Sequence, residues 1–137
     1  MEIIVVIGGP LDNGSIRRWL NQKLQQKDNQ EFQFIGVDGG CIKLMEEELP
    51  IDLAIGDFDS ISSEDKEVLK NYASKMIEFP SEKDFTDFEE ALMWIAKSYP
   101  QKKVHVLGAF GGRVDHAIMD HVSSRITSIN SVSFARR

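Results

Sequence analysis

The sequence has one cysteine and no long hydrophobic run. Cys41 cannot form a disulfide within its own chain, and a single thiol is too few for a cysteine-based zinc site. We expect a buried, structural Cys41 ahead of a reactive thiol. No apolar stretch approaches the roughly 20 residues that a membrane-spanning helix needs. Because the N-terminus runs directly into a strand-like segment, we expect no secretory signal, no membrane association and a cytoplasmic location.

Basic charge is also scarce. The 137 residues include 16 Lys and Arg against 22 Asp and Glu, which gives a formal net charge of −6. This balance disfavours a nucleic-acid surface. If such an acidic protein binds a polyphosphate, metal ions should supply much of the positive charge. The length and the hydrophobic content of 42% predict one globular domain with its own core.

Two common phosphate-binding motifs are missing. The absence of G-x-x-x-x-G-K-[ST] excludes a P-loop protein, and without G-x-G-x-x-G after the first apolar run a dinucleotide-type Rossmann site is unsupported. The sequence has glycine pairs instead, and each pair can either admit a ligand close to the backbone or serve only a tight turn. These pairs are Gly8-Gly9, Gly39-Gly40 and Gly111-Gly112.

Continuous apolar runs, typical of buried parallel strands, alternate with helical patterns. We expect strands over 2–7, 32–37, 51–55, 75–79 and 103–107, and helices over 15–26, 42–49, 62–72, 86–99 and 114–124. This alternation predicts an α/β fold, a three-layer α/β/α sandwich with a mainly parallel central sheet. We expect one domain over 1–125 and a tail over 126–137, in which β-forming residues allow a final edge strand.

Helix signals support two of these elements. Ser62 begins a capping sequence for the helix that ends near Tyr72. Thr86 and Glu89 fit a capping box, and the apolar residues behind them recur on one helical face. That face comprises Phe88, Leu92, Ile95 and Tyr99.

Two aspartates follow the central apolar run, in Ile55-Gly56-Asp57-Phe58-Asp59-Ser60. In extended geometry Asp57 and Asp59 point to the same side and Phe58 points into the protein. Two carboxylates so close repel each other unless a cation lies between them or one is protonated, and Mg²⁺ prefers such oxygens. The alternative is an Asx-type turn without a ligand.

Acidic side chains, with a few cations, recur after the expected strands. Because the carboxyl ends of parallel strands lie at one edge, where open α/β sheets bind ligands, we expect a shared site there. Carboxylates with Lys and Arg around a polyphosphate fit phosphoryl-type transfer, which depends on positioning and charge neutralisation. The residues concerned are Asp38, Asp57, Asp59, Lys83, Asp84, Asp87, Arg113, Asp115 and His116.

Three motifs together resemble the thiamine pyrophosphokinase family. They are Asp38-Gly39-Gly40 with the Ile55–Ser60 segment, Ser81-Glu82-Lys83-Asp84-Phe85-Thr86-Asp87, and Gly108-Ala109-Phe110-Gly111-Gly112-Arg113-Val114-Asp115-His116. Their order and spacing match the family's catalytic N-terminal domain over about residues 1–118. The resemblance implies a Mg²⁺-dependent thiamine diphosphokinase that transfers diphosphate from ATP to the hydroxyl of thiamine, giving AMP and thiamine diphosphate. It also implies a homodimer.

The resemblance also implies roles for individual residues. Catalysis would involve Asp57, Asp59, Asp87 and Arg113, and Mg²⁺ would be held by Asp38, Asp57, Asp59 and Asp87. Nucleotide binding would involve Gly8, Gly9, Asp38, Gly39, Lys83, Asp84, Gly111, Gly112, Arg113, Asp115 and His116. The proton of the hydroxyl has several candidate acceptors, namely Asp59, Asp87 and His116.

Two departures from the family keep alternatives open. The family's C-terminal β-sandwich domain, which helps to hold thiamine, has no counterpart among residues 126–137. The residues after His116 also differ from the family's usual apolar helix. The alternatives are a truncated, non-catalytic Mg-nucleotide-binding module, or a diphosphokinase for another alcohol such as a pterin.

Overall fold

The computed structural model describes residues 1–8, 14–26, 31–59, 61–79, 87–99, 102–108 and 131–135, with backbone alone at 87–90 and 131–135. The strands are β1 (Glu2–Ile7), β2 (Phe32–Val37), β3 (Leu53–Gly56), β4 (Met76–Glu78), β5 (Lys103–Leu107) and β6 (Ser131–Ala135). The helices are α1 (Ser15–Gln26), α2 (Gly40–Glu46), α3 (Ser63–Tyr72) and α4 (Asp87–Ser98). The helix expected over 114–124 lies outside the described residues.

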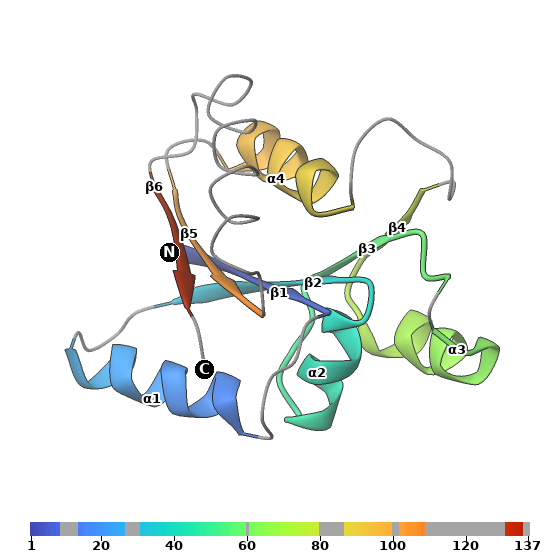
Figure 1. Cartoon of the computed structure of the whole chain (residues 1–137), viewed down its shortest axis with the longest axis horizontal. Coiled ribbons are helices and arrows are strands. Elements are labelled where there is room, and N and C mark those ends of the chain that lie inside the picture. The colour runs from blue at the N-terminus through green and yellow to red at the C-terminus, as the bar shows by residue number, and fades with distance from the viewer. Residues whose placement is uncertain are drawn as a thin grey trace.

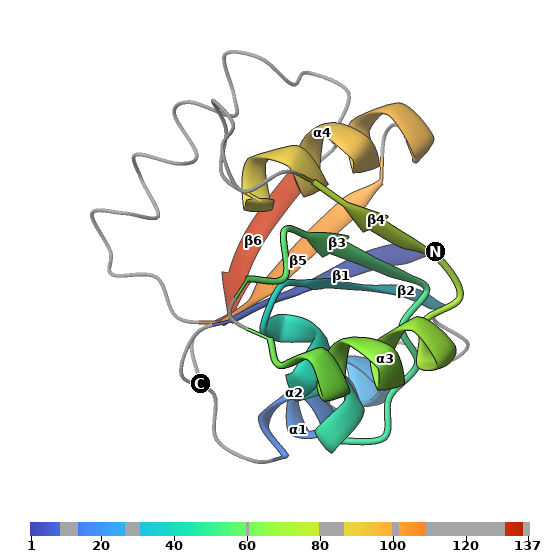
Figure 2. The same ribbon diagram turned by 90° about the vertical axis from the view of Figure 1, so that its right-hand side faces the viewer.

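The six strands form one sheet in the order β4-β3-β2-β1-β5-β6, and every described pair is parallel. Helices α1, α2 and α3 cover one face and α4 covers the other (Figures 1 and 2). Right-handed crossovers explain this division. From β1 to β4 each new strand is added on the same side, which places α1, α2 and α3 on one face. The chain then returns through α4 to β5 on the other side of β1, which places α4 on the opposite face. The predicted three-layer sandwich is confirmed, with a fully parallel sheet in the described part of the chain.

Several predicted boundaries hold, and others move by a few residues. The Ser62 cap is confirmed, because its hydroxyl accepts a hydrogen bond from the Asp65 N–H at 3.1 Å. The strand within the 126–137 tail is also confirmed, as β6 at the edge of the sheet. Helix α2 begins at Gly40, two residues before its predicted start, and β3 begins at Leu53 instead of residue 51.

The two faces of the sheet bury separate hydrophobic clusters. Alternate β1 residues divide between them, as the two-residue period of a strand requires. Ile3 and Val5 pack with Leu92 and Ile95 of α4, whereas Ile4 packs with residues of α1, α2 and α3. The predicted apolar face of α4 is therefore confirmed at Leu92 and Ile95, both fully buried.

Cys41 belongs to the second cluster and is fully buried. Burial, with a smaller contribution from the charge of Asp38, raises the pKa of its thiol to about 12. The thiol therefore stays protonated at neutral pH, and the predicted structural role of Cys41 is supported.

A part-buried ionisable pair lies at the amino end of the sheet. Glu2 contacts Nε2 of His105 on the neighbouring strand, and the Trp19 ring packs on the histidine at 5.0 Å between centroids. Burial raises the pKa of Glu2, but the hydrogen bond and charge of His105, with Lys103 and Lys23, outweigh it and lower the pKa. This pair links β1 to β5 and gives His105 a structural role.

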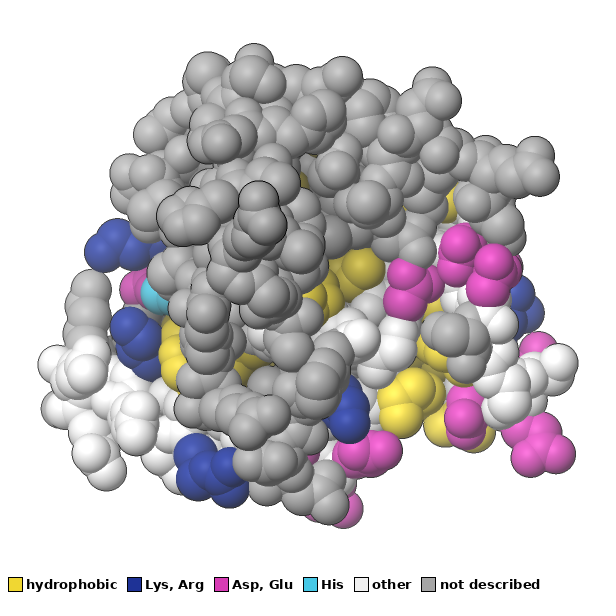
Figure 3. Space-filling model, viewed as in Figure 1, with side chains coloured by type: hydrophobic (Ala, Val, Ile, Leu, Met, Phe, Trp, Pro, Cys, Tyr) yellow, Lys and Arg dark blue, Asp and Glu magenta, His cyan; other side chains and the backbone are white. Residues whose placement is uncertain are grey.

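Acidic side chains are prominent on one side of the molecule. In the space-filling view most of the magenta side chains lie towards α3 (Figure 3). Glu64, Asp65 and Glu67 of that helix are exposed. Among the described helices, none has both the length and the apolar character needed to cross a bilayer.

Candidate functional site

The strand order creates a switch point between β1 and β5, where connections leave in opposite directions. Open α/β sheets bind ligands at such a point, outside the carboxyl ends of the strands. Gly8 directly follows β1, Asp38 follows β2, and Asp57 follows β3. The described part of the predicted site therefore lies along the carboxyl edge from β1 to β3, as expected.

Asp38 joins the end of β2 to the loop after β3. Its N–H donates to the Ile55 carbonyl at 3.0 Å, and its Oδ1 accepts the Phe58 N–H at 2.9 Å. Asp38 has φ of +49°, a left-handed conformation that aspartate adopts more readily than most residues do. The two loops are thus held together by a side chain and not only by the strands below them.

Gly56 makes this contact sterically feasible. Its φ is +149°, and a Cβ atom at this position would lie 2.2 Å from Oδ1 of Asp38. The Gly56 carbonyl also accepts the Phe79 N–H at 2.8 Å, which attaches the loop to the end of β4. Any larger residue would displace the Asp38 carboxylate and strain the backbone.

The segment that carries Asp57 and Asp59 is a turn, and the prediction of extended geometry is wrong. Phe58 has φ of +60°, and Oδ1 of Asp57 accepts the Asp59 N–H at 3.0 Å. This bond is that of the Asx turn weighed as the alternative. The inward direction of Phe58 is confirmed, because its side chain is only 3% exposed and packs in the core. The buried ring anchors the turn, and Asp59 beside it is exposed.

The glycines at this edge serve close packing of the backbone. A Cβ on Gly8 would lie 3.2 Å from the Cα of Gly39, so the ends of β1 and β2 meet without side chains between them. Gly40 has a different role, because a Cβ there would lie 1.8 Å from the Val6 carbonyl oxygen. The N-terminal end of α2 can approach β1 only with glycine at position 40.

The donor chemistry at the carboxyl edge suits a hard divalent cation. Asp57 and Asp59 present carboxylate oxygens from one turn, the ligand type that Mg²⁺ prefers. Within the described residues, no three His, Cys, Asp or Glu side chains are grouped closely enough to hold a metal. The fourth predicted ligand, Asp87, begins α4 with only its backbone described. A two-carboxylate turn fits Mg²⁺, which commonly binds through one or two carboxylates plus substrate phosphates.

Several predicted site residues lie outside the described residues and stay predictions. The structure therefore brings together Asp38, Gly39, Asp57 and Asp59, with Gly8 against Gly39. Those not described are Gly9, Lys83, Asp84, Gly111, Gly112, Arg113, Asp115 and His116.

The start of α1 has a protein carboxylate in the place where a Rossmann-type site would hold phosphate. Glu47 accepts the N–H groups of Ile16 and Arg17 at 3.2 and 3.0 Å. The Arg17 side chain in turn donates from Nε to the Glu47 carbonyl at 2.7 Å. These α1 donors are already engaged, which agrees with the missing glycine motif. No local sequence pattern signals this cap, because its partners are about 30 positions apart.

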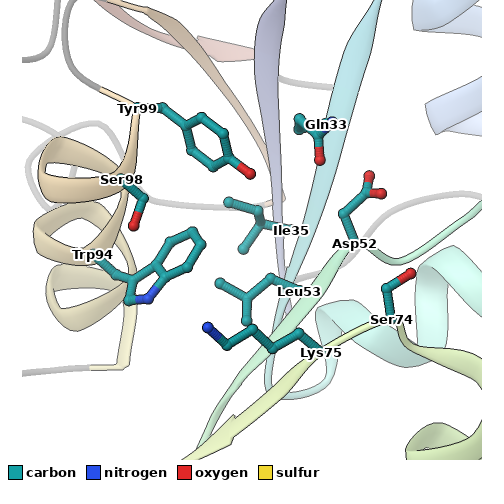
Figure 4. A pocket seen from close by; sticks show the side chains of 9 residues that line it. All are labelled: Gln33, Ile35, Asp52, Leu53, Ser74, Lys75, Trp94, Ser98 and Tyr99. Atoms are coloured by element: carbon teal, nitrogen blue, oxygen red, sulfur yellow. The ribbon is translucent and has the colours of Figure 1, made fainter.

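A separate cavity of about 450 Å³ lies at the opposite, amino edge of the sheet. Ile35 and Leu53 line it from the strands, and Trp94 and Tyr99 line it from the end of α4 (Figure 4). Lys75 reaches the Trp94 ring, with Nζ 5.5 Å from its centroid. None of the described residues that were predicted for catalysis, nucleotide binding or metal binding lines this cavity.

Two features of the site go beyond the sequence expectations. They are the space that Gly56 leaves for the Asp38 carboxylate and the backbone N–H of Phe58 as its hydrogen-bond donor. A glycine placed directly before an aspartate at a strand end was the available signal, since such a position often needs an unusual φ.

Comparison with known proteins identifies relatives over most of the chain. Residues 23–129 match the family described as thiamin pyrophosphokinase, catalytic domain. The thiamine pyrophosphokinase of Bacillus subtilis (strain 168) is 32% identical over 115 residues, which make up 83% of this chain and 50% of that protein.

Solved structures agree with this match. A thiamin pyrophosphokinase family protein from Enterococcus faecalis has a TM-score of 0.70 at 26% identity, over 98% of this chain and 61% of that one. Thiamine pyrophosphokinase from Bacillus subtilis has a TM-score of 0.67 at 26% identity, over 98% and 60%. The chain thus spans about half to three fifths of the length of these relatives.

Proposed function

Because this chain belongs to the thiamin pyrophosphokinase family, through its catalytic domain, we propose that it forms the Mg-nucleotide-binding part of a thiamine diphosphokinase. The reaction would transfer diphosphate from ATP to the hydroxyl of thiamine, with thiamine diphosphate and AMP as products. The observation that carries the proposal is the Asp57–Asp59 turn, which Asp38 joins to the end of β2 at the carboxyl edge. Acidic residues of this kind suit a metal-bound polyphosphate and would repel a bare one.

The proposed mechanism depends on positioning and charge. Asp57 and Asp59 would hold Mg²⁺, with Asp87 as a further predicted ligand. Asp38, predicted from sequence for the same set, accepts the Phe58 N–H within this turn. When bound, Mg²⁺ would neutralise phosphate charge and make the β-phosphorus more electrophilic. Gly8 and Gly39, whose backbones pack closely against each other, would lie beside the nucleotide. Arg113 would donate hydrogen bonds to phosphate oxygens, as guanidinium groups do.

The direct test is a product assay. The protein is incubated with ATP, MgCl₂ and thiamine, and nucleotides and thiamine diphosphate are separated by chromatography. We expect AMP and thiamine diphosphate in equal amounts. Release of ADP would contradict a diphosphate transfer, because it indicates transfer of a single phosphoryl group. A parallel panel with a hydroxymethyl pterin separates thiamine from the other alcohol that the sequence left open.

A second candidate function for the same site is Mg-nucleotide binding without transfer. The aspartate turn and the closely packed glycines at the carboxyl edge are features that nucleotide binding alone would also use. Calorimetry that detects Mg-ATP binding, with no AMP in the product assay, would support this module. The homodimer and the cytoplasmic location also stay predictions, and light scattering after size-exclusion chromatography measures the first of them.

A further inference from the structure

Asp38 and Phe58 face each other across the β2–β3 edge, and both have left-handed backbone conformations, with φ of +49° and +60°. A left-handed conformation is unfavourable for a non-glycine residue, so the surrounding structure must stabilise it. Here Oδ1 of Asp38 accepts the Phe58 N–H at 2.9 Å. The unfavourable conformation of the turn is therefore coupled to one side-chain hydrogen bond.

The bonded N–H belongs to the peptide group between Asp57 and Phe58. Its orientation fixes ψ of Asp57 and φ of Phe58, and Oδ1 of Asp57 in turn accepts the Asp59 N–H. The backbone of the turn that carries both carboxylates is thus held by the contact with Asp38. Gly56 leaves the space for that contact, since a Cβ there would lie 2.2 Å from the same oxygen.

We propose that Asp38 is a positioning residue, whose carboxyl oxygen fixes the turn that presents Asp57 and Asp59 to the ligand. The ligand part of this inference rests on the proposed function, and the turn itself does not. The proposal changes the role predicted for Asp38 from sequence. Its hydrogen-bond acceptor, and not its negative charge, is what the site requires.

Replacement by Asn separates the two roles. Asp38→Asn keeps an oxygen acceptor and tolerates the left-handed conformation, but it removes the charge. Asp38→Ala removes both the acceptor and the charge. Asp52 is a matched control at the opposite edge, because its Oδ2 accepts the Phe34 N–H at 2.8 Å. Asp52→Ala thus loses a similar bond far from the turn.

The first measurement is amide hydrogen exchange of Phe58 by NMR, without ligand. We expect exchange to be at least tenfold faster in Asp38→Ala and nearly unchanged in Asp38→Asn and Asp52→Ala. If Asp38→Ala does not fold, Gly56→Ala replaces it, because the added Cβ displaces the same carboxylate while its charge is kept. Unchanged Phe58 exchange in the folded Ala variant would overturn the proposal.

The second measurement is Mg-ATP affinity by calorimetry. We expect Asp38→Ala to bind at least tenfold more weakly and the conservative Asp38→Asn to restore most of the affinity lost in Asp38→Ala. Asp52→Ala should lose stability but not affinity. If Asp38→Asn binds as weakly as Asp38→Ala while Phe58 stays protected, the charge itself is needed and the proposal is wrong. If wild type does not bind Mg-ATP, the proposed function fails, and hydrogen exchange still decides whether Asp38 holds the turn.

Discussion

Individual carboxylates in this molecule differ in what they contact. Their surroundings indicate which of them should affect ligand binding and which should affect stability. Asp57 lies partly exposed at the carboxyl edge, in the turn that also carries Asp59. Glu2 lies at the other end of the sheet, against His105 and within the fields of Lys103 and Lys23. We expect substitution of Asp57 to affect the ligand and substitution of Glu2 to affect folding.

Asp57→Asn should weaken Mg-ATP binding without unfolding the protein. The Asn oxygen can still accept the Asp59 N–H, so the turn is kept while one negative charge is lost. We expect an affinity loss of roughly tenfold or more, about 1.4 kcal/mol, by calorimetry. Asp52→Asn is the control, because its carboxylate lies at the amino edge. Equal nucleotide affinity in a folded Asp57→Asn variant would remove Asp57 from the site.

Glu2→Gln should change how the free energy of unfolding depends on pH. The pKa of Glu2 is lowered from its ordinary 4.5 in the folded state. The stabilisation is therefore fully present above pH 4.5 and is lost as the pH falls through the lowered folded value. We expect the variant to be less stable by about 1–2 kcal/mol at pH 7, with the difference shrinking in acid.

Urea unfolding at pH 7 and at pH 3 measures this difference. Glu46→Gln, an exposed position at the end of α2, is the control and should behave as wild type at both pH values. A stability gap between Glu2→Gln and wild type that is the same at pH 7 and pH 3 would show that the Glu2 charge is not responsible.

Among the elements, α1 depends on a partner from another part of the chain. Its first N–H groups are capped by Glu47, which follows α2, and Arg17 donates back to the Glu47 carbonyl. A carboxylate at a helix N-terminus also interacts favourably with the helix dipole. This reciprocal contact explains why Glu47 is half-buried although its neighbours Glu46 and Glu48 are exposed.

Glu47→Ala should destabilise the protein by about 1 kcal/mol, and by up to about 2, as the loss of an N-cap does elsewhere. Glu47→Gln should cost less, since the amide oxygen remains an acceptor. Thermal and urea unfolding measure both variants, with Glu46→Ala as the exposed control. If Glu47→Ala and Glu46→Ala have the same stability, the cap makes no net contribution.

Local signals predicted the elements better than the contacts between them. The Ser62 cap and the apolar face with Leu92 and Ile95 each follow from residues close together in the sequence. Both predictions were confirmed. The Glu47 cap depends on packing between helices, so no short sequence pattern predicts it. The Phe58 turn was missed for a related reason, because its conformation is stabilised by Asp38, 20 positions away.

For the whole molecule, the topology brings the chemistry to one edge. The alternation of apolar runs with helical patterns was enough to predict a parallel sheet. A parallel sheet in turn predicts that Asp38, Asp57 and Asp59 lie at the same edge. The direction of each side chain could not be predicted, because it depends on backbone conformations that only the assembled loops impose. The formal net charge of −6 adds a global condition, since an acidic protein attracts a polyphosphate poorly without cations.

Removal of Mg²⁺ should therefore abolish most nucleotide binding. In EDTA we expect the affinity for ATP to fall at least tenfold, and added MgCl₂ should restore it. Calorimetry in NaCl of matched ionic strength is the control, because it screens charge without supplying a divalent ion. Equal ATP affinity in EDTA and in MgCl₂ would contradict a metal-dependent site.

The environment of Cys41 has a practical consequence for spectroscopy. The chain's one native thiol is buried and stays protonated at neutral pH, so maleimide reagents should not react with it. A single cysteine introduced at Ser98, beside the amino-edge cavity, would then take up a dye selectively. Fluorescence from that position could follow the folding of the domain while leaving the aspartate-bearing edge chemically untouched.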